Sequence, residues 1–184
     1  MRIVAGTARG TRLAPVPRGV RPVSDMAREG MFSSLGAWVE GTRVLDLYSG
    51  TGALAIEALS RGAERAVLVE RDRSAVRTIR DNLHRARVAD RAAVVASDVP
   101  SFLRRPAGSR SPVGLVFLDP PYATRTAEIE AVLEVLTSGW LSERGWRTVL
   151  TRPATDPNLV IPVHWLVARR LSYGDTLVLI FREA

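Results

Sequence analysis

Short apolar runs alternate with helical segments along most of the chain. The runs with the length and branched residues of buried strands are Val44–Leu47, Ala66–Val69, Ala93–Ala96, Leu115–Leu118 and Thr148–Leu150. Between them, helical patterns lie near Gly52–Ser60, Ser74–Arg85, Val99–Leu103 and Ala127–Leu136. Strands that alternate with helices in this way are typical of an α/β protein with a parallel sheet covered on both faces.

The two ends of the chain depart from this alternation. Glycines and prolines recur through residues 1–24, which excludes a long helix and predicts an arm with a possible β-hairpin. Ser24 or Asp25 then caps a helix that Gly41 ends. Near the C-terminus, Trp165–Leu171 and Thr176–Phe181 flank a turn and predict a hairpin. We therefore divide the chain into an arm, residues 1–24, and a domain, residues 25–184, whose mostly parallel sheet has an antiparallel edge.

The composition excludes several kinds of site. Hydrophobic residues make up 46% and charged residues 24%, which is typical of a globular protein. The absence of cysteine excludes disulfides, thiolate metal sites and cysteine nucleophiles, and two histidines are too few for a histidine zinc site, so we expect no metal. Neither a membrane helix nor a signal peptide is recognisable, and we expect a cytoplasmic protein without a membrane partner.

Positive charge is concentrated at the start of the chain. The formal net charge is +7, and every basic residue is an arginine. A basic arm on a nearly neutral body fits a polyanionic partner, because each phosphate that is neutralised releases counterions. The alternative is a solvated tail that keeps the protein in solution. The arginines that precede the first acidic residue are Arg2, Arg9, Arg12, Arg18 and Arg21.

A glycine-containing turn follows the first strand, in VLDLYSGTGALAIEAL. Asp46 ends the strand, and Gly50 and Gly52 allow a sharp turn and the close approach of a ligand to the main chain. Glu70 ends the next strand, where a carboxylate can accept both hydroxyls of a ribose. Asp98 follows the third strand, where its carboxylate can bind an adenine amino group. The alternative is that Asp98 only caps the next helix.

Two classes of cofactor fit this turn. The string G-T-G-A-L-A matches the looser dinucleotide fingerprint, so a nicotinamide enzyme is one reading. Asp46, however, would repel a pyrophosphate and attract the cationic methionine end of S-adenosylmethionine. Because acids follow three successive strands, we favour S-adenosylmethionine over both the nicotinamide and a plain strand-to-helix turn.

A second motif, Asp119-Pro120-Pro121-Tyr122, follows the apolar run GLVFL. The prolines lack N–H groups and stiffen the turn. The Asp119 carboxylate and the Pro120 carbonyl can then accept both N–H bonds of an exocyclic amine on a nucleobase. Tyr122 offers a face on which the base can stack, and the base must be unpaired or turned out of its helix. The alternative is a rigid turn with a buried tyrosine.

Together, DLYSGTG and DPPY resemble the motifs of class I S-adenosylmethionine-dependent methyltransferases that act on amino groups. RIVAGTARGTRL followed by RPVSDMAREGMFSSL is similar to the start of the RsmD family, and the similarity continues through GALAIEALSRGA, VLVERD and YGDTLVLIFRE. That family methylates the guanine N2 amine of small-subunit (16S) ribosomal RNA. Adenine and cytosine amino-methyltransferases share DPPY, so the choice of guanine depends on the N-terminal match.

The resemblance implies a Rossmann-like, seven-stranded sheet whose last strands are antiparallel. It also implies S-adenosylmethionine as cofactor, S-adenosylhomocysteine as product, and a substrate within an assembling 30S particle with its ribosomal proteins; we expect a monomer. The alternatives are an adenine-N6 or cytosine-N4 methyltransferase on DNA or RNA, and a non-catalytic RNA-binding assembly factor. For the cofactor, the resemblance implies that Asp46, Gly50 and Gly52 contact the methionine part, Glu70 the ribose and Asp98 the adenine, with Tyr48 elsewhere on the cofactor. For the substrate, it implies that the guanine is held by Asp119, Pro120, Pro121 and Tyr122. Arg28 and the arm arginines would contact RNA phosphates.

Overall fold

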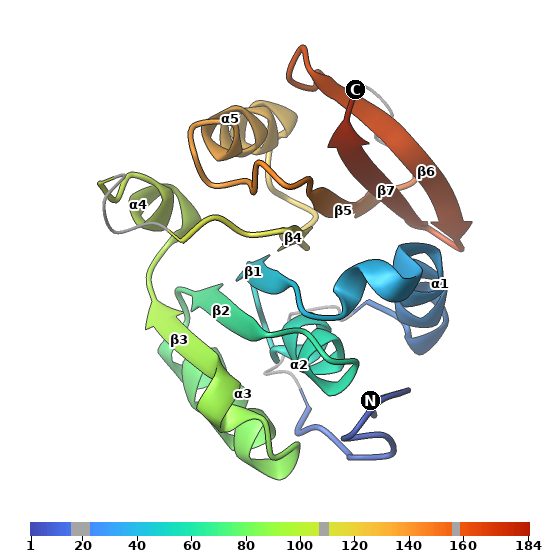
Figure 1. Cartoon of the computed structure of the whole chain (residues 1–184), viewed down its shortest axis with the longest axis vertical. Helices are drawn as coiled ribbons and strands as arrows, with labels where there is room; N and C mark the ends of the chain where they lie inside the picture. The colour runs from blue at the N-terminus through green and yellow to red at the C-terminus, as the bar shows by residue number, and fades with distance from the viewer. Residues whose placement is uncertain (16–22, 107–110, 156–158) are drawn as a thin grey trace.

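The fold is built around a mixed β-sheet (Figure 1). The computed structural model describes residues 1–15, 23–106, 111–155 and 159–184. Within these ranges the sheet has seven strands in the order β3-β2-β1-β4-β5-β7-β6. Strands β1 to β5 run parallel, whereas β7 is antiparallel to both β5 and β6. The strands are β1 (Arg43–Leu47), β2 (Arg65–Glu70), β3 (Ala92–Ala96), β4 (Leu115–Leu118), β5 (Arg147–Pro153), β6 (Trp165–Tyr173) and β7 (Thr176–Glu183).

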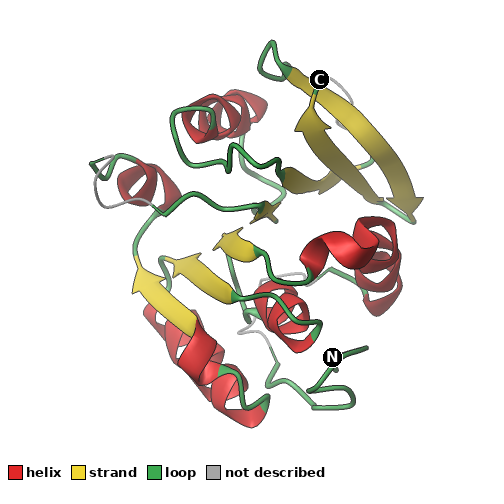
Figure 2. Ribbon diagram, viewed as in Figure 1, coloured by secondary structure: helices red, strands yellow, loops and turns green. Residues whose placement is uncertain are grey.

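Helices cover both faces of the sheet (Figure 2). One hydrophobic core lies between the sheet and α1, α2 and α3, and a second lies between the sheet and α4 and α5. The α/β architecture and the antiparallel C-terminal edge confirm the prediction from the sequence. None of the helices in the described ranges is long and apolar enough to cross a membrane. The helices are α1 (Asp25–Leu35), α2 (Ala53–Ser60), α3 (Arg73–Arg85), α4 (Val99–Leu103) and α5 (Thr126–Leu136).

Helix α1 begins where the sequence predicts and ends earlier. The Ser24 hydroxyl accepts a hydrogen bond from the Ala27 N–H at 3.1 Å and caps the first turn. Gly36 takes φ of 54°, which ends the helix, and the chain continues as a 3₁₀ helix to Val39. The prediction that Gly41 ends the helix is therefore wrong, because the earlier glycine already takes a positive φ that stops it.

Strand β5 is longer than its apolar run. The sequence predicts Thr148–Leu150, but the strand continues through Thr151 and Arg152, which are 1% and 4% exposed. The Arg152 guanidinium donates to the Thr124 carbonyl at 3.0 Å, so its charge is hydrogen-bonded within the fold. Polar residues thus extend the strand toward the loop that follows β4.

The described part of the arm, residues 1–15, packs against α2 and α3 through its main chain. The Val4 and Ala5 N–H groups donate to the buried carboxylate of Glu57 at 2.8 and 3.0 Å. The Ala14 N–H donates to the Asn82 side chain at 2.7 Å, and Arg2 pairs with Arg12 in an antiparallel bridge. Ile3, Ala8 and Leu13 are buried in the core. This segment is therefore not a solvated tail.

Candidate active site

A cavity of about 1130 Å³ lies at the carboxyl ends of the central parallel strands. Loops after β1, β2, β3 and β4 form its walls, which is where open α/β sheets bind their ligands. The cavity therefore brings both sequence motifs together in one place. The predicted site residues that line it are Arg28, Asp46, Tyr48, Gly50, Glu70, Asp98, Asp119, Pro120, Pro121 and Tyr122.

The glycine turn after β1 uses its two glycines differently. Gly50 takes φ of 57°, and a Cβ added there would meet no atom within 4 Å, so its main chain is open to a ligand. A Cβ on Gly52 would come within 3.0 Å of Leu68. Gly52 is not among the residues that line the cavity. Gly52 lets α2 pack closely on β2, and its contact with the cofactor stays a prediction.

Asp46 has an unsatisfied carboxylate oxygen. The residue is 1% exposed, and its Oδ2 accepts a hydrogen bond from the Ala55 N–H at 3.3 Å. Its Oδ1 has no hydrogen-bond partner in the described structure. Burial raises the pKa of Asp46 well above its ordinary value, and the charges of Asp119 and Glu70 raise it further. A positively charged group in the cavity would restore the ionised form.

The other two acids make hydrogen bonds at their own strand ends. Glu70 accepts from the Gly50 N–H at 2.9 Å and from the Asp72 N–H at 2.8 Å, so it orients the glycine turn. A carboxylate oxygen can accept a further bond, which leaves Glu70 able to take ribose hydroxyls. Asp98 accepts from the Ser101 N–H at 2.8 Å, and this bond lowers the pKa of Asp98. Asp98 therefore caps α4 at the edge of the cavity.

The DPPY turn is held by side chains from later strands. The Thr151 hydroxyl on β5 donates to Oδ1 of Asp119. Burial raises the pKa of Asp119 to about 6, although the bond from Thr151 lowers it in part. The Tyr122 hydroxyl is hydrogen-bonded to the Thr176 hydroxyl on β7 at 3.0 Å, while 40% of the tyrosine stays exposed. Tyr122 is therefore not the buried tyrosine of a purely structural turn.

Comparison with known proteins agrees with these motifs. The model of the family described as Conserved hypothetical protein 95 matches residues 1–182. The chain is 32% identical to the putative rRNA methyltransferase YlbH of Bacillus subtilis, over 100% of this chain and 99% of that protein. It is 34% identical to ribosomal RNA small subunit methyltransferase D of Escherichia coli K12, over 100% and 91% of the two chains. The chain belongs to the RsmD family.

A solved structure supports the membership in the RsmD family. The putative methyltransferase yhhF from Escherichia coli is 31% identical, with a TM-score of 0.87 over 100% of this chain and 97% of that one. The seven-stranded sheet described above is accordingly the Rossmann-like sheet of class I methyltransferases.

Three residues of this RsmD-family site were missed or placed differently by the sequence analysis. Thr151 and Thr176 were not predicted, because no local motif marks them. The one local signal was the position of Thr151 directly after the apolar residues Val149 and Leu150. Arg28 was expected to contact phosphate with the arm arginines, but it is 1% exposed and lines the cavity. Its burial therefore favours contact with a group that enters the cavity.

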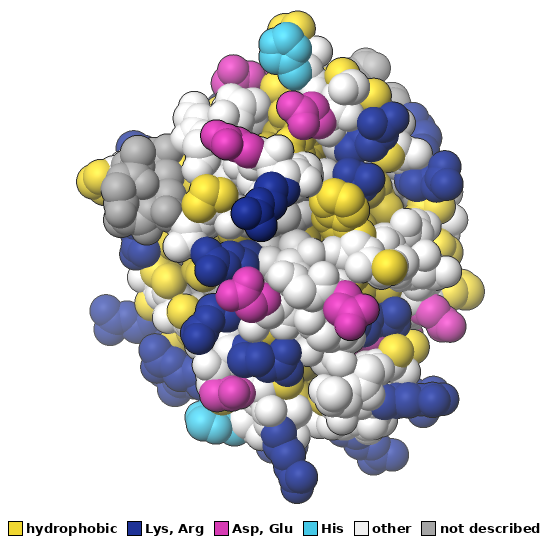
Figure 3. Space-filling view, viewed as in Figure 1, with side chains coloured by type: hydrophobic (Ala, Val, Ile, Leu, Met, Phe, Trp, Pro, Cys, Tyr) yellow, Lys and Arg dark blue, Asp and Glu magenta, His cyan; other side chains and the backbone are white. Residues whose placement is uncertain are grey.

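The arm arginines of this RsmD-family member lie on its surface. Arg2, Arg9 and Arg12 are exposed, and Arg18 and Arg21 lie outside the described residues. Figure 3 shows arginines around the periphery of one face, with acidic side chains between them. The exposed guanidinium groups are free to meet a polyanion at the surface, which Arg28 is not.

Proposed function

We propose that this protein transfers a methyl group from S-adenosylmethionine to the exocyclic N2 amine of a guanine in 16S ribosomal RNA. The single observation that supports the chemistry most strongly is the placement of Asp46 and Asp119 in one cavity. One buried carboxylate is suited to a cationic cofactor, and the other is suited to an amine. The base and the RNA are inferred from the RsmD family, whose Escherichia coli relative is named a ribosomal RNA small subunit methyltransferase.

The residues around the cavity fit S-adenosylmethionine. Asp46 would hold the methionine end through its free oxygen, Gly50 would present open main chain, and Glu70 would accept the ribose hydroxyls. Tyr48 and Asp98 would contact the remainder of the cofactor. When bound, S-adenosylmethionine supplies a methyl group activated by a sulfonium. The cavity of about 1130 Å³ is slightly larger than the usual range for ligand sites, so it leaves space for a base beside the cofactor.

Asp119 and Pro120 would hold the attacking amine. Among the described residues, no hydrogen bond is made to the Pro120 carbonyl oxygen. This oxygen and the Asp119 carboxylate can each accept one N–H of the guanine amine, which favours a pyramidal nitrogen with its lone pair free for attack on the methyl group. Positioning of the two reactants then provides most of the rate acceleration. After transfer, the methylated cationic nitrogen loses its proton to Asp119 or to water.

Tyr122 would support the base. Tyr122 lines the cavity and is 40% exposed, and the hydrogen bond to Thr176 fixes its hydroxyl. Stacking of a base on an aromatic ring contributes about 1 to 3 kcal/mol. Pro121 keeps the turn rigid, because its carbonyl accepts a hydrogen bond from the Thr124 N–H at 2.8 Å. The guanine must leave its stack to reach this position.

The alternative functions require different properties of this cavity. An adenine or cytosine amino-methyltransferase would use DPPY equally well, so the base needs a direct test. A nicotinamide enzyme would place a pyrophosphate next to the unpaired Asp46 oxygen, which is repulsive. A non-catalytic assembly factor has no need for an acid held as Asp119 is held by Thr151.

The deciding experiment supplies labelled S-adenosylmethionine together with assembling small subunits, free 16S ribosomal RNA or duplex DNA. The methylated nucleoside is then identified by mass spectrometry, with the Asp119→Ala protein as control. We expect N2-methylguanosine on the small-subunit particle. N6-methyladenosine or N4-methylcytidine would contradict the choice of guanine, and RNA binding without any methyl transfer would favour the assembly factor.

We further propose that the exposed arginines of the arm bind RNA phosphates. Arg2, Arg9 and Arg12 lie on one segment that the hydrogen bonds to Glu57 attach to α2. A segment that is held rigidly can present its charges to RNA at a fixed distance from the cavity. Contacts of this kind position the substrate without reading its sequence.

A further inference from the structure

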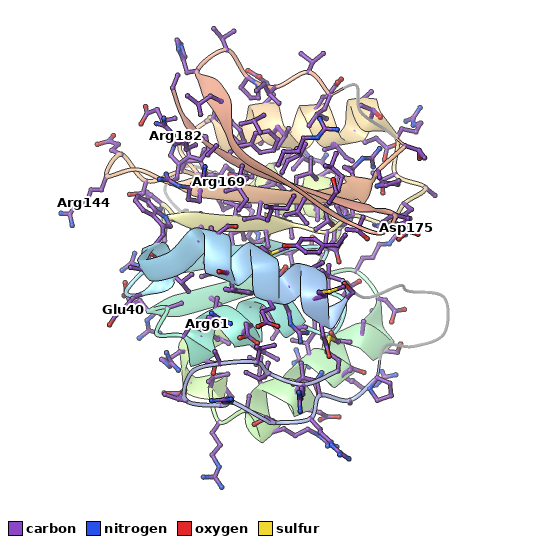
Figure 4. The ribbon with its side chains drawn as sticks, turned by 90° about the vertical axis from the view of Figure 1, so that its right-hand side faces the viewer. Glu40, Arg61, Arg144, Arg169, Asp175 and Arg182 are labelled. Atoms are coloured by element: carbon purple, nitrogen blue, oxygen red, sulfur yellow. The ribbon has the colours of Figure 1, made fainter. Side chains whose placement is uncertain are left out.

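Arg28 has buried donor groups without partners. It lies on α1, which runs between the arm and the C-terminal hairpin (Figure 4). Its Nη2 donates to the Arg2 carbonyl at 2.5 Å and to Asp25 at 2.8 Å. Its Nε and Nη1 have no hydrogen-bond partner in the described structure, and the side chain is 1% exposed. A guanidinium cannot lose its charge to relieve this, so these donors favour an anionic partner.

The ion pair with Asp25 does not neutralise Arg28 inside the cavity. The Asp25 side chain is 57% exposed, so water screens its charge. The unpaired side of the guanidinium therefore remains positive beside a cavity that Arg28 helps to line. Leaving a buried charged donor without an acceptor is costly, and an acceptor oxygen within the cavity would remove that cost.

The cavity thus holds two buried, incompletely paired groups of opposite charge. Among the described residues, Asp46 has no donor for Oδ1, and Arg28 has no acceptors for Nε and Nη1. An α-amino acid group, with its ammonium and its carboxylate, complements such a pair. We propose that Arg28 binds the α-carboxylate at the methionine end of the cofactor while Asp46 binds the ammonium. This inference rests on the proposed function, because it assumes that S-adenosylmethionine occupies the cavity.

Arg28 suits a small ligand better than an RNA phosphate. A phosphate of the RNA backbone is attached to the chain on both sides, and it needs an exposed cation. Arg28 is 1% exposed, whereas Arg2, Arg9 and Arg12 of the arm are all exposed. A terminal carboxylate on a ligand that already occupies the cavity meets no such obstacle. Arg28 is therefore assigned to cofactor recognition and not to the RNA interface.

The test compares two ligands that differ only in the carboxylate. Isothermal titration calorimetry measures the binding of S-adenosylhomocysteine and of its decarboxylated analogue to the full chain. The wild-type protein should prefer S-adenosylhomocysteine by about 10- to 100-fold, the effect expected of a hydrogen bond between charged groups. Arg28→Met should lose most of this preference while changing the affinity for the analogue by less than about 3-fold.

Two further variants keep the test independent of folding. Arg28→Lys retains the charge and should keep part of the preference, because an ammonium can still pair with a carboxylate. Arg85→Met, which removes an exposed arginine on α3, should keep all of it. Because the measured quantity is a ratio of two affinities for the same protein, a general loss of folded protein does not mimic the expected result.

The possible outcomes separate this inference from the function on which it rests. Equal loss of affinity for both ligands in Arg28→Met would assign Arg28 a purely structural role and overturn the inference. Unchanged preference together with weaker RNA binding would make Arg28 a phosphate contact and would also overturn it. Wild-type protein that binds neither ligand and methylates no base would instead contradict the proposed function itself.

Discussion

The two halves of the cavity are held in place by different means. On the proposed cofactor side, Gly50 is oriented by its main-chain conformation and by its hydrogen bond to Glu70. Gly50 lies in the turn after β1, and Glu70 is the last residue of β2. On the proposed base side, Asp119 and Tyr122 are held by the hydroxyls of Thr151 and Thr176. Those hydroxyls come from β5 and β7, and β7 is part of the antiparallel edge.

This difference predicts which substitutions separate the two functions. Changes on the cofactor side should alter the affinity for S-adenosylhomocysteine. Changes on the base side should alter turnover, and they should do so even when they lie on strands remote in sequence from the motif. The antiparallel edge is thereby part of the proposed catalytic apparatus as well as part of the fold.

The largest effect is expected from Asp119→Ala. Loss of the acceptor should lower kcat by about 10³-fold, while the affinity for S-adenosylhomocysteine changes by only a few fold. Single-turnover methylation and calorimetry measure the two quantities. Comparable loss of both would show that the two halves are not separable and that Asp119 is structural.

Asp119→Asn is the matched control, because it retains the size of the side chain. The pKa of Asp119 is raised to about 6 in the folded protein, so the unfolded chain ionises first as pH rises. The stabilising effect of the protonated carboxyl is full below about pH 4 and is lost as pH rises through about 6. At pH 8 the asparagine variant should therefore be more stable by about 1 to 2 kcal/mol, which denaturant unfolding can measure.

The second effect concerns Asp46 on the cofactor side. Asp46→Asn should lower the affinity for S-adenosylhomocysteine by about 10- to 100-fold, because it removes the charge that pairs with the ammonium. The same change should raise the unfolding temperature of the free protein, since burial of this carboxylate is unfavourable. An unfolding temperature that falls together with the affinity would contradict this assignment.

A smaller effect is expected from Thr151→Val on the base side. This change removes the hydroxyl that lowers the pKa of Asp119, and kcat should fall by about 10-fold at neutral pH. The proposed mechanism uses the ionised Asp119 carboxylate, so the wild-type rate should decline as pH falls below about 6. In Thr151→Val this decline should begin at higher pH. If kcat falls but its pH dependence does not shift, Thr151 does not influence the ionisation of Asp119.

Thr151→Ser is the control, because it keeps the hydroxyl and should restore the wild-type pH dependence.

The smallest effect is expected at the arm, outside both halves. Arg9→Ala and Arg12→Ala should each weaken RNA binding by a few fold and reduce the slope of binding against salt by about one unit. Affinity for S-adenosylhomocysteine should not change. Filter binding across a salt series measures the slope. If turnover on the ribosomal substrate and the slope both match those of the wild type, the arm does not contact RNA phosphates.

The sequence predicted the centre of the sheet better than its margins. The central strands are apolar on both faces, so their runs are continuous, and β4 was predicted with its observed ends at Leu115 and Leu118. Strand β5 was predicted too short, because it includes the charged residue Arg152. The Arg152 guanidinium is buried and donates a hydrogen bond to the Thr124 carbonyl, which no local sequence pattern indicates. The end of α1 was misplaced for a different reason: two glycines could stop the helix, and the first one does.

The same distinction applies to the candidate site. Asp46 and Glu70 lie near the ends of apolar strands, Asp119 directly follows one, and the structure places all three in one cavity. The partner of Asp119 lies 32 residues away and that of Tyr122 lies 54 residues away, so neither could be read from a local motif. The burial of Arg28 likewise depends on how α1 packs against the rest of the fold.

The attachment of the arm has an evolutionary consequence. The carboxylate of Glu57 binds the amide groups of Val4 and Ala5, and Ser60 binds those of Thr7 and Ala8. Every amino acid except proline carries such an amide, so this attachment is indifferent to the identity of most arm side chains. Exposed positions of the arm can therefore diverge between species without detaching the arm from the enzyme.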